Sequence, residues 1–356
     1  MTRLHKIVLG IETGDLAEEL EAYLGLSLIN KGDRRGRTPL MWAFMRDDLD
    51  AAEILLQNGA DVIKRCRHGA NILNCARSVE GLDLCLKYFP ASLINSFSPA
   101  SGITALLSIN QQLTILPESD EDTDAKNFQF TSRLIDAGAD VNLGSVSGNT
   151  PLRECAARNY PRTTKLLLDC GADVNKSCRK GITAIMEAIR ERADASLSII
   201  LNEPGNIKFP LKNSHGWNFL HYLAWYGSYE ILELFKTVDF SGMGADTGLK
   251  IADCKEGILG CTPEELAIYR FEDEKDMKRI PESRREEWWD SFIKLLNRIR
   301  EQTRISLLDE ISSGTSEEQE DIERTSDPED SSDDEEFHDC YSDAHTSPQD
   351  AAEILI

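Results

Sequence analysis

The sequence predicts an all-α solenoid built from about eight stacked helical units, followed by an acidic tail. Equivalent positions recur 33 residues apart, from Thr38 to Asn71, from Asn71 to Thr104 and from Thr150 to Thr183. A Gly-x-Thr-Pro-Leu segment recurs along the chain, and so does a Gly-Ala-Asp-Val-Asn segment. A fixed period of this length is typical of repeat arrays, in which each unit packs only on its neighbours.

The two segments mark where a pair of helices begins and ends. Threonine before proline suits a helix start, because its hydroxyl accepts from an N–H group that the first turn leaves unpaired, and proline there gives up no hydrogen bond. Glycine suits the end of the second helix, where the backbone takes a positive φ. The threonines are Thr38, Thr150 and Thr262, and the glycines are Gly59, Gly138 and Gly171. We expect these residues to build the fold rather than to carry chemistry.

These segments resemble the ankyrin repeat, a 33-residue unit that contains a Thr-Pro-Leu-His pattern. The resemblance covers about residues 1–303. It implies helix-turn-helix units joined by hairpin fingers. It also implies that partners bind to the fingers and to the concave face formed by the first helices.

The pattern divides the chain into four parts. We expect an N-terminal capping unit in residues 1–37 and repeats in 38–261, with unit starts near 38, 71, 104, 150, 183 and 218. Residues 262–303 are expected to hold the last repeat and a C-terminal capping helix. Residues 304–356 are expected to be a disordered acidic tail, because they contain too few apolar residues to offset the entropy of folding.

The third and fourth units are among those that depart from the pattern. In the third, Asn71-Ile72-Leu73-Asn74 replaces Thr-Pro-Leu-His, although asparagine can still cap a helix. The fourth is 46 residues long, and its surplus, residues 116–124, contains five acids and no base. We interpret the surplus as a solvated loop between the two helices of the unit, either a tolerated surface insertion or a functional acidic patch.

Two features near the C-terminal end are predicted to be structural. His221 alone occupies the histidine position of the pattern, where the resemblance implies a bond to the backbone rather than a metal ligand or a catalytic base. A helix from Arg284 to about Thr303 is expected to close the end of the stack, and the alternative is a face offered to a partner. Its apolar stripe consists of Trp288, Phe292, Leu295, Leu296 and Ile299.

The charge distribution and the cysteine content help to predict the cellular compartment of the protein. Residues 309–356 contain 18 acids and one base, a net charge of −17, which leaves −6 of the total of −23 for residues 1–308. Nine cysteines without a Cys-x-x-Cys pair suit ordinary thiols in a reducing compartment. No apolar run approaches the roughly 18 residues of a membrane span, and the start does not resemble a secretory signal. We expect a monomer without membrane contact, cytoplasmic and/or nuclear.

Catalytic signatures are missing from the sequence. It contains no phosphate-binding Gly-x-x-x-x-Gly-Lys loop, no His-Glu-x-x-His and no Gly-x-Ser-x-Gly. We therefore predict no catalytic residue, no cofactor and no metal, and we regard a non-enzyme as the better interpretation. The alternative, an enzyme, would require an unrecognised site between repeats.

The predicted fingers carry an uneven charge. The first two and the fifth each carry a net charge of +3, the sixth +2, and residues 97–102 and 143–149 none. Either the fingers are merely polar, or their bases attract an acidic protein partner or the chain's own acidic tail. Nucleic acid is disfavoured, because the tail competes for the same bases. The candidate partner-binding residues are Arg34, Arg35, Arg37, Lys64, Arg65, Arg67, Lys176, Arg179 and Lys180.

The tail offers candidate modification sites. Ser331 and Ser332 are followed three positions later by acids, a pattern that resembles acidophilic kinase sites. The best-supported function is a non-enzymatic protein-binding scaffold or adaptor. The alternative is a cytoplasmic inhibitor or regulator of a transcription factor with a phosphorylatable acidic tail, because repeats followed by such a tail resemble the inhibitors of Rel-type factors.

Overall fold

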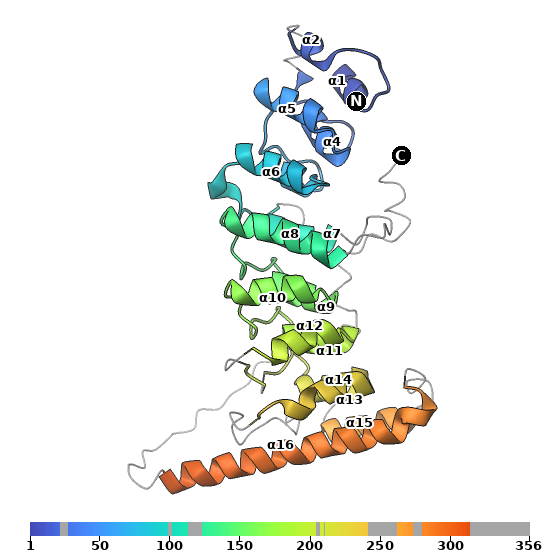
Figure 1. Cartoon of the computed structure of the whole chain (residues 1–356), viewed down its shortest axis with the longest axis vertical. Coiled ribbons are helices and arrows are strands. Elements are labelled where there is room, and N and C mark those ends of the chain that lie inside the picture. Colours follow the sequence, from blue (N-terminus) through green and yellow to red (C-terminus); the bar gives the residue numbers. More distant parts are fainter. Residues whose placement is uncertain are drawn as a thin grey trace, which may run out of the picture.

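The computed structural model describes residues 1–21, 28–98, 102–112, 123–203, 207–209, 211–240, 262–272 and 280–313. These residues form an elongated stack of helix pairs, with the N-terminal unit at one end and the long helix α16 across the other (Figure 1). No strand occurs within the described ranges. The predicted all-helical solenoid is confirmed.

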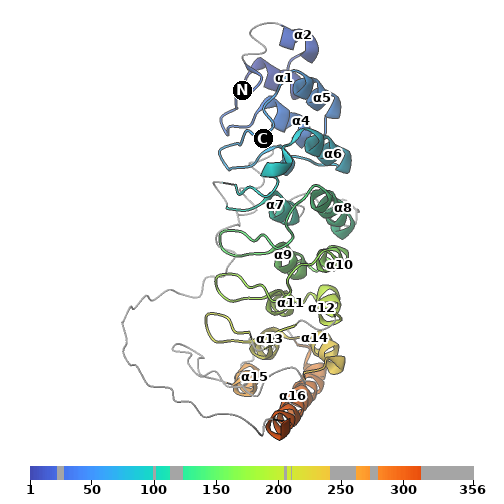
Figure 2. The same ribbon diagram turned by 90° about the vertical axis from the view of Figure 1, so that its left-hand side faces the viewer.

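Most units contribute two antiparallel helices. The first helices are α1 (Arg3–Val8), α4 (Pro39–Met45), α7 (Ala105–Gln112), α9 (Pro151–Ala157), α11 (Ala184–Glu191), α13 (Phe219–Tyr226) and α15 (Pro263–Glu272). The second helices are α2 (Leu16–Glu21), α5 (Leu49–Gln57), α6 (Val79–Tyr88), α8 (Thr123–Asp136), α10 (Pro161–Asp169), α12 (Asp194–Leu201) and α14 (Tyr229–Leu234). In Figure 2 the first helices form an inner row beside the hairpins, and the second helices form the outer row.

The recurring segments act as the sequence predicts. The Thr38 hydroxyl accepts from Met41 N at 3.3 Å, and the Thr150 hydroxyl accepts from Arg153 N at 3.2 Å. The closing glycines Gly59, Gly138 and Gly171 have φ values of +81°, +93° and +84°. Caps and closing glycines therefore fix both ends of each helix pair.

The first unit is more regular than a capping segment needs to be. Thr2-Arg3-Leu4-His5 reproduces the start of the pattern, and Thr2 N donates to His5 Nδ1 at 3.0 Å. His5 Nε2 donates to Arg37 O in the next unit at 2.8 Å. The prediction that His221 alone occupies this position is therefore wrong. His221 does have the predicted structural role, because its Nδ1 accepts from Asn218 N at 3.3 Å.

The third unit has no first α-helix. A single 3₁₀ turn, η1 (Ile72–Asn74), takes its place. In the second unit ten residues separate the caps Thr38 and Asp48, but only seven separate Asn71 and Ser78. Three residues are about one helical turn, so the second helix begins before a second turn of the first can form.

Polar side chains join the fourth unit to the fifth. Tyr160 precedes α10 without providing a side-chain cap. The Asp124 carboxylate of α8 caps that helix instead, accepting from Arg162 N at 2.8 Å and from Thr163 N at 3.1 Å. Asp124 is buried in α8, so the prediction that it belongs to a solvated loop is wrong. Residues 116–122 of the predicted insertion lie outside the described residues.

The helix α16 (Arg285–Ser313) closes the stack, after the 3₁₀ turn η6 (Glu282–Arg284). All five residues of the predicted apolar stripe are buried, and α16 packs on α14. The helix ends ten residues beyond Thr303, where the sequence predicted the tail to begin. No proline or glycine stands between Arg285 and Gly314, which explains its length.

The buried apolar residues form two clusters. One runs from Leu4 to Ala139 and the other from Val141 to Ile299. Six described cysteines are free thiols, and burial raises the pKa of Cys75 to about 12. In the part of the chain that the structure describes, no helix is both long and apolar enough to span a membrane.

Candidate partner-binding edge

Hairpin fingers project from one side of the stack, between successive units (Figure 2). Each is closed by a backbone hydrogen bond across its base, for example from Cys66 N to Ala70 O at 2.9 Å and from Cys178 N to Ile182 O at 3.1 Å. We number the fingers along the chain. Fingers 1 to 6 comprise the described residues of segments 31–37, 64–70, 96–103, 143–149, 176–182 and 208–217.

Backbone hydrogen bonds join neighbouring finger tips. Arg67 N of finger 2 donates to Arg35 O of finger 1 at 2.9 Å. Arg179 N of finger 5 donates to Ser147 O of finger 4 at 2.9 Å, and Ser214 N of finger 6 donates to Lys180 O at 2.8 Å. Fingers 3 and 4 are joined in the same way, and the Arg65 side chain donates to Ser96 Oγ between fingers 2 and 3. The fingers therefore form one continuous edge.

Glycine at the finger tips permits this close approach. Gly181 has a φ of +74°, and a Cβ built on it would lie 2.7 Å from Asn213 Cα and from Lys212 O. A Cβ on Gly148 would lie 3.0 Å from Cys178 Cα. Any side chain at Gly181 would therefore push fingers 5 and 6 apart.

Replacing Gly181 by alanine is expected to open the edge between fingers 5 and 6. Gly171 provides a matched control, because its φ of +84° imposes the same left-handed strain but its Cβ would meet nothing within 4 Å. We expect Gly171→Ala to lower the free energy of unfolding by about 1–2 kcal/mol, and Gly181→Ala by a further 1–3 kcal/mol, roughly the cost of overpacking.

Urea unfolding and amide hydrogen exchange check this prediction. The Ser214 amide should exchange faster in Gly181→Ala and at the wild-type rate in Gly171→Ala. Equal effects of the two substitutions on stability and on Ser214 exchange would mean that the contact between the fingers is not tight.

The predicted bases of fingers 1 and 2 divide into two groups. Arg37 is engaged within its own unit, because its Nε donates to Asp33 Oδ2 at 3.0 Å and its guanidinium lies 4.0 Å from the centre of the Trp42 ring. Arg65 donates to Gly69 O and Ser96 Oγ, both at 2.9 Å, and burial lowers its pKa. The others are exposed or half-buried along the edge and make up the N-terminal basic patch: Lys31, Arg34, Arg35, Lys64 and Arg67.

The bases of fingers 5 and 6 are all exposed. Lys176 donates to Asn142 O at 2.7 Å from this exposed position. The tip-to-tip bond from Ser214 N to Lys180 O brings the two fingers side by side. Together they make the C-terminal basic patch: Lys176, Arg179, Lys180, Lys208 and Lys212.

The middle of the edge is apolar rather than merely neutral. Phe97 of finger 3 is 44% exposed and Val146 of finger 4 is 58% exposed. Ile63, just before finger 2, is 47% exposed. Two exposed apolar side chains, Phe97 and Val146, thus lie between the two basic patches, and Ile63 lies beside the N-terminal patch.

The first helices add an aromatic surface near finger 6. Trp225 of α13 and Tyr269 of α15 stack with their ring centres 6.2 Å apart, and Tyr269 is 47% exposed. Aromatic residues contribute disproportionately to binding at protein interfaces. This pair could not be predicted from the sequence pattern, because 44 residues separate its two members.

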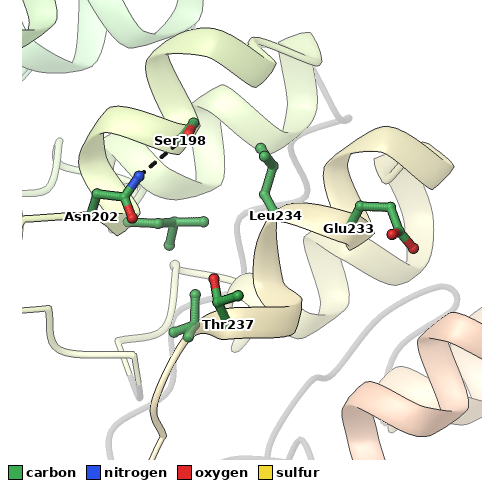
Figure 3. Close-up of a pocket in the computed structure, with 7 residues that line it drawn as sticks. Ser198, Asn202, Glu233, Leu234 and Thr237 are labelled. Atoms are coloured by element: carbon green, nitrogen blue, oxygen red, sulfur yellow. Dashed lines mark hydrogen bonds between the residues drawn. The ribbon is translucent and has the colours of Figure 1, made fainter.

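A pocket lies between the ends of α12 and α14 (Figure 3). Its volume is about 200 Å³, smaller than the 300–1,000 Å³ typical of small-molecule sites. Ser198 and Asn202 line one side and are joined by a 3.5 Å hydrogen bond, with Glu233, Leu234 and Thr237 opposite. The pocket is a gap at a helix junction, and none of the predicted residues lines it.

Two further predictions concern chemistry. Within the described residues, no group of three or more His, Cys, Asp or Glu side chains could hold a metal ion. Ser331 and Ser332, like the acidic tail beyond Ser313, lie outside the described residues.

The comparisons with known proteins agree with the repeat architecture. The family model of the ankyrin repeat matches residues 35–75, and that of three consecutive ankyrin repeats matches residues 155–242. No curated protein matches the sequence. The crystal structure of the ankyrin repeat domain of Bcl-3, described as a unique member of the IkappaB protein family, is similar with a TM-score of 0.53 and 21% identity, covering 66% of this chain and 98% of that domain. Repeat signatures, helix pairs and family matches agree, and the chain is an ankyrin repeat protein.

Proposed function

We propose that this chain is a non-catalytic scaffold inside the cell, and that its finger edge holds an acidic segment of a protein partner. Ankyrin repeats serve as protein-binding modules, so protein binding itself follows from the family. The finer proposal rests on one observation: the fingers are hydrogen-bonded into a continuous edge with a basic patch towards each end. Carboxylates of a partner would be attracted to both patches, and its apolar side chains would meet Phe97 and Val146 between them.

A pair of matched variants tests the role of the fingers. Arg34→Ser/Arg67→Ser removes two exposed charges from the N-terminal basic patch and leaves the structural Arg37 and Arg65 in place. Lys87→Ser/Lys294→Ser removes two exposed charges from helices α6 and α16, away from the fingers. The readout is fluorescence anisotropy with a labelled peptide of alternating glutamate and leucine.

The finger variant is expected to bind the probe about tenfold more weakly at low salt, and the helix variant is expected to bind it as the wild type does. A change of that size follows if each of the two exposed arginines contributes roughly 0.5–1 kcal/mol to the free energy of binding. Equal affinities of the two variants would overturn the finger proposal, since net charge alone would then explain the attraction.

A second candidate function is the regulation of a transcription factor. It is favoured by the similarity to the ankyrin repeat domain of Bcl-3, a member of the IkappaB protein family, and by an acidic stretch after the repeats. Calorimetry with a purified Rel-type factor tests it directly. Heat of binding that disappears with Arg34→Ser/Arg67→Ser would support this candidate, and no heat at micromolar concentrations would exclude it.

A further inference from the structure

The closing helix α16 contacts the chain just after α14, which in turn packs against finger 6. Phe240 N donates to Gln302 Oε1 of α16 at 3.1 Å, and the Phe240 ring lies 5.0 Å from the ring of Phe209 in finger 6. Arg298 of the same helix bonds to the backbone oxygens of Phe235 and Lys236, where α14 ends. The middle of α16 therefore lies close to the base of finger 6, with Phe240 between them.

The segment that follows is opposite in charge to the nearest fingers. Residues 314–356 contain 16 acids and one base. Half of these acids fall within residues 327–339, which contain no lysine or arginine. The C-terminal basic patch presents five exposed bases.

We propose that residues 327–339 dock in cis on the C-terminal basic patch, so that this chain covers part of its own binding edge. The inference rests on the proposed function, because it assigns to the same edge an acidic ligand carried by the chain itself. A partner that uses this patch must displace the segment, whereas the N-terminal basic patch stays open to a partner.

Chain length favours the C-terminal patch over the N-terminal one. Eleven residues of helix from Gln302 to Ser313 span about 16 Å, so Ser313 lies within roughly 25 Å of finger 6. The acids at residues 333–336 begin 20 residues after Ser313, and a flexible chain of that length spans about 25 Å. Fingers 1 and 2 lie four to five units further along, at about 10 Å per unit, beyond the typical reach of the segment.

Tethering makes a weak attraction effective. A short flexible linker gives an effective concentration of the order of 1 mM. If the free segment binds the patch with a dissociation constant near 0.1 mM, the tethered one occupies it about nine-tenths of the time. A competing acidic ligand then binds roughly tenfold more weakly at the C-terminal patch.

Zero-length carbodiimide cross-linking of the full chain tests the docked position. This reagent couples a lysine amine to a carboxylate only where the two are in contact. The expected links join Lys176, Lys180, Lys208 or Lys212 to acids within residues 327–339, and they disappear in 0.5 M salt, where the Debye length is about 4 Å. Links mainly to Lys31 and Lys64, or no links within the monomer, would overturn the inference.

A competition experiment separates this inference from the proposed function. The probe is a fluorescent peptide of residues 325–340, added to the full chain and to a full-length variant whose eight acids within 327–339 are changed to Asn or Gln. The inference predicts that the neutralised variant binds the probe about tenfold more tightly. Adding Lys176→Ser/Arg179→Ser/Lys180→Ser should abolish the gain, whereas adding Lys31→Ser/Arg34→Ser/Arg67→Ser should preserve it.

The remaining outcomes are also decisive. Equal binding to the full chain and to the neutralised variant would mean that the fingers take an acidic ligand but that the segment does not cover them. The inference would then fail and the proposed function would stand. If the peptide binds neither the full chain nor the neutralised variant, both the inference and the proposed function are wrong.

Discussion

Replacing Glu187 by alanine is expected to lower the free energy of unfolding by about 3–5 kcal/mol, the usual cost of leaving a buried charge without its partner. The Glu187 side chain is fully buried in α11. It lies 3.3 Å from Arg153 Nη2 of α9 and 2.5 Å from Arg190 Nη2 of its own helix. Arg153 is itself almost fully buried, so alanine would leave a guanidinium in the interior facing an apolar side chain.

Two control variants identify the charge as the cause. Glu187→Gln keeps the volume and one acceptor and is expected to cost less than Glu187→Ala. Arg153→Met/Glu187→Leu removes both partners and is expected to recover most of the loss, because a buried ion pair contributes little compared with well-packed apolar residues. Urea unfolding monitored by circular dichroism measures all three. If the double variant is as unstable as Glu187→Ala, packing rather than charge governs this position.

The contribution of Glu187 to the free energy of unfolding is expected to decrease with rising pH. Burial raises the pKa of Glu187, although Arg153 and Arg190 act in the opposite direction. The folded state therefore binds the proton more tightly than the unfolded state, and this residue's contribution to stability falls as the pH rises from about 4.5 through the raised pKa. Glu187→Gln has no such proton to bind, so the stability difference between the wild type and this variant should shrink over the same window.

Replacing Trp288 by alanine is expected to release the closing helix, at a cost of about 3–5 kcal/mol. The Trp288 side chain is fully buried, and its Nε1 donates to Gly227 O at 3.1 Å. Arg270 of α15 donates to Ala224 O at 2.9 Å and lies 5.3 Å from the centre of the Trp288 ring. Three elements, α13, α15 and α16, therefore meet at the turn that contains Gly227.

Trp289→Ala is the matched control, because the neighbouring indole is only partly buried. We expect it to cost less than half as much. Hydrogen exchange adds a local measurement: the α13 and α14 amides should exchange faster in Trp288→Ala and change little in Trp289→Ala. Equal protection in the two variants would mean that α16 contributes little to holding the last repeats.

Local rules predicted the repeats well. A capping threonine, a first-turn proline and a closing glycine act within a few residues, so Thr38 and Gly59 could be assigned from the sequence alone. The stripe on α16 was predictable too, because helical periodicity by itself places Trp288 and Phe292 on one face.

The features that the sequence did not reveal depend on a neighbouring unit. Asp124 looked like one acid among five in a loop, and its role appears only when α10 is placed beside it. The sequence predicted Arg65 to be a partner-binding base of finger 2. In the structure its guanidinium instead donates to Ser96 Oγ of the next finger. The bases could be counted from the sequence, but the engagement of Arg65 depends partly on Ser96, which lies 31 residues further along the chain.

The polar junction at Asp124 also bears on how the array folds. It coincides with the break between the two apolar clusters, and Asn127 at the same junction lies against Thr163 with its Oδ1 left without a partner. Coupling between repeats comes from nearest-neighbour contacts, and the hydrogen bonds at this junction contribute only modestly to net stability. We therefore expect reduced cooperativity at this junction, so that the array behaves as two folding blocks. The N-terminal block contains the shortened third unit and would then unfold first. The C-terminal block, which α16 closes through Trp288, would stay folded.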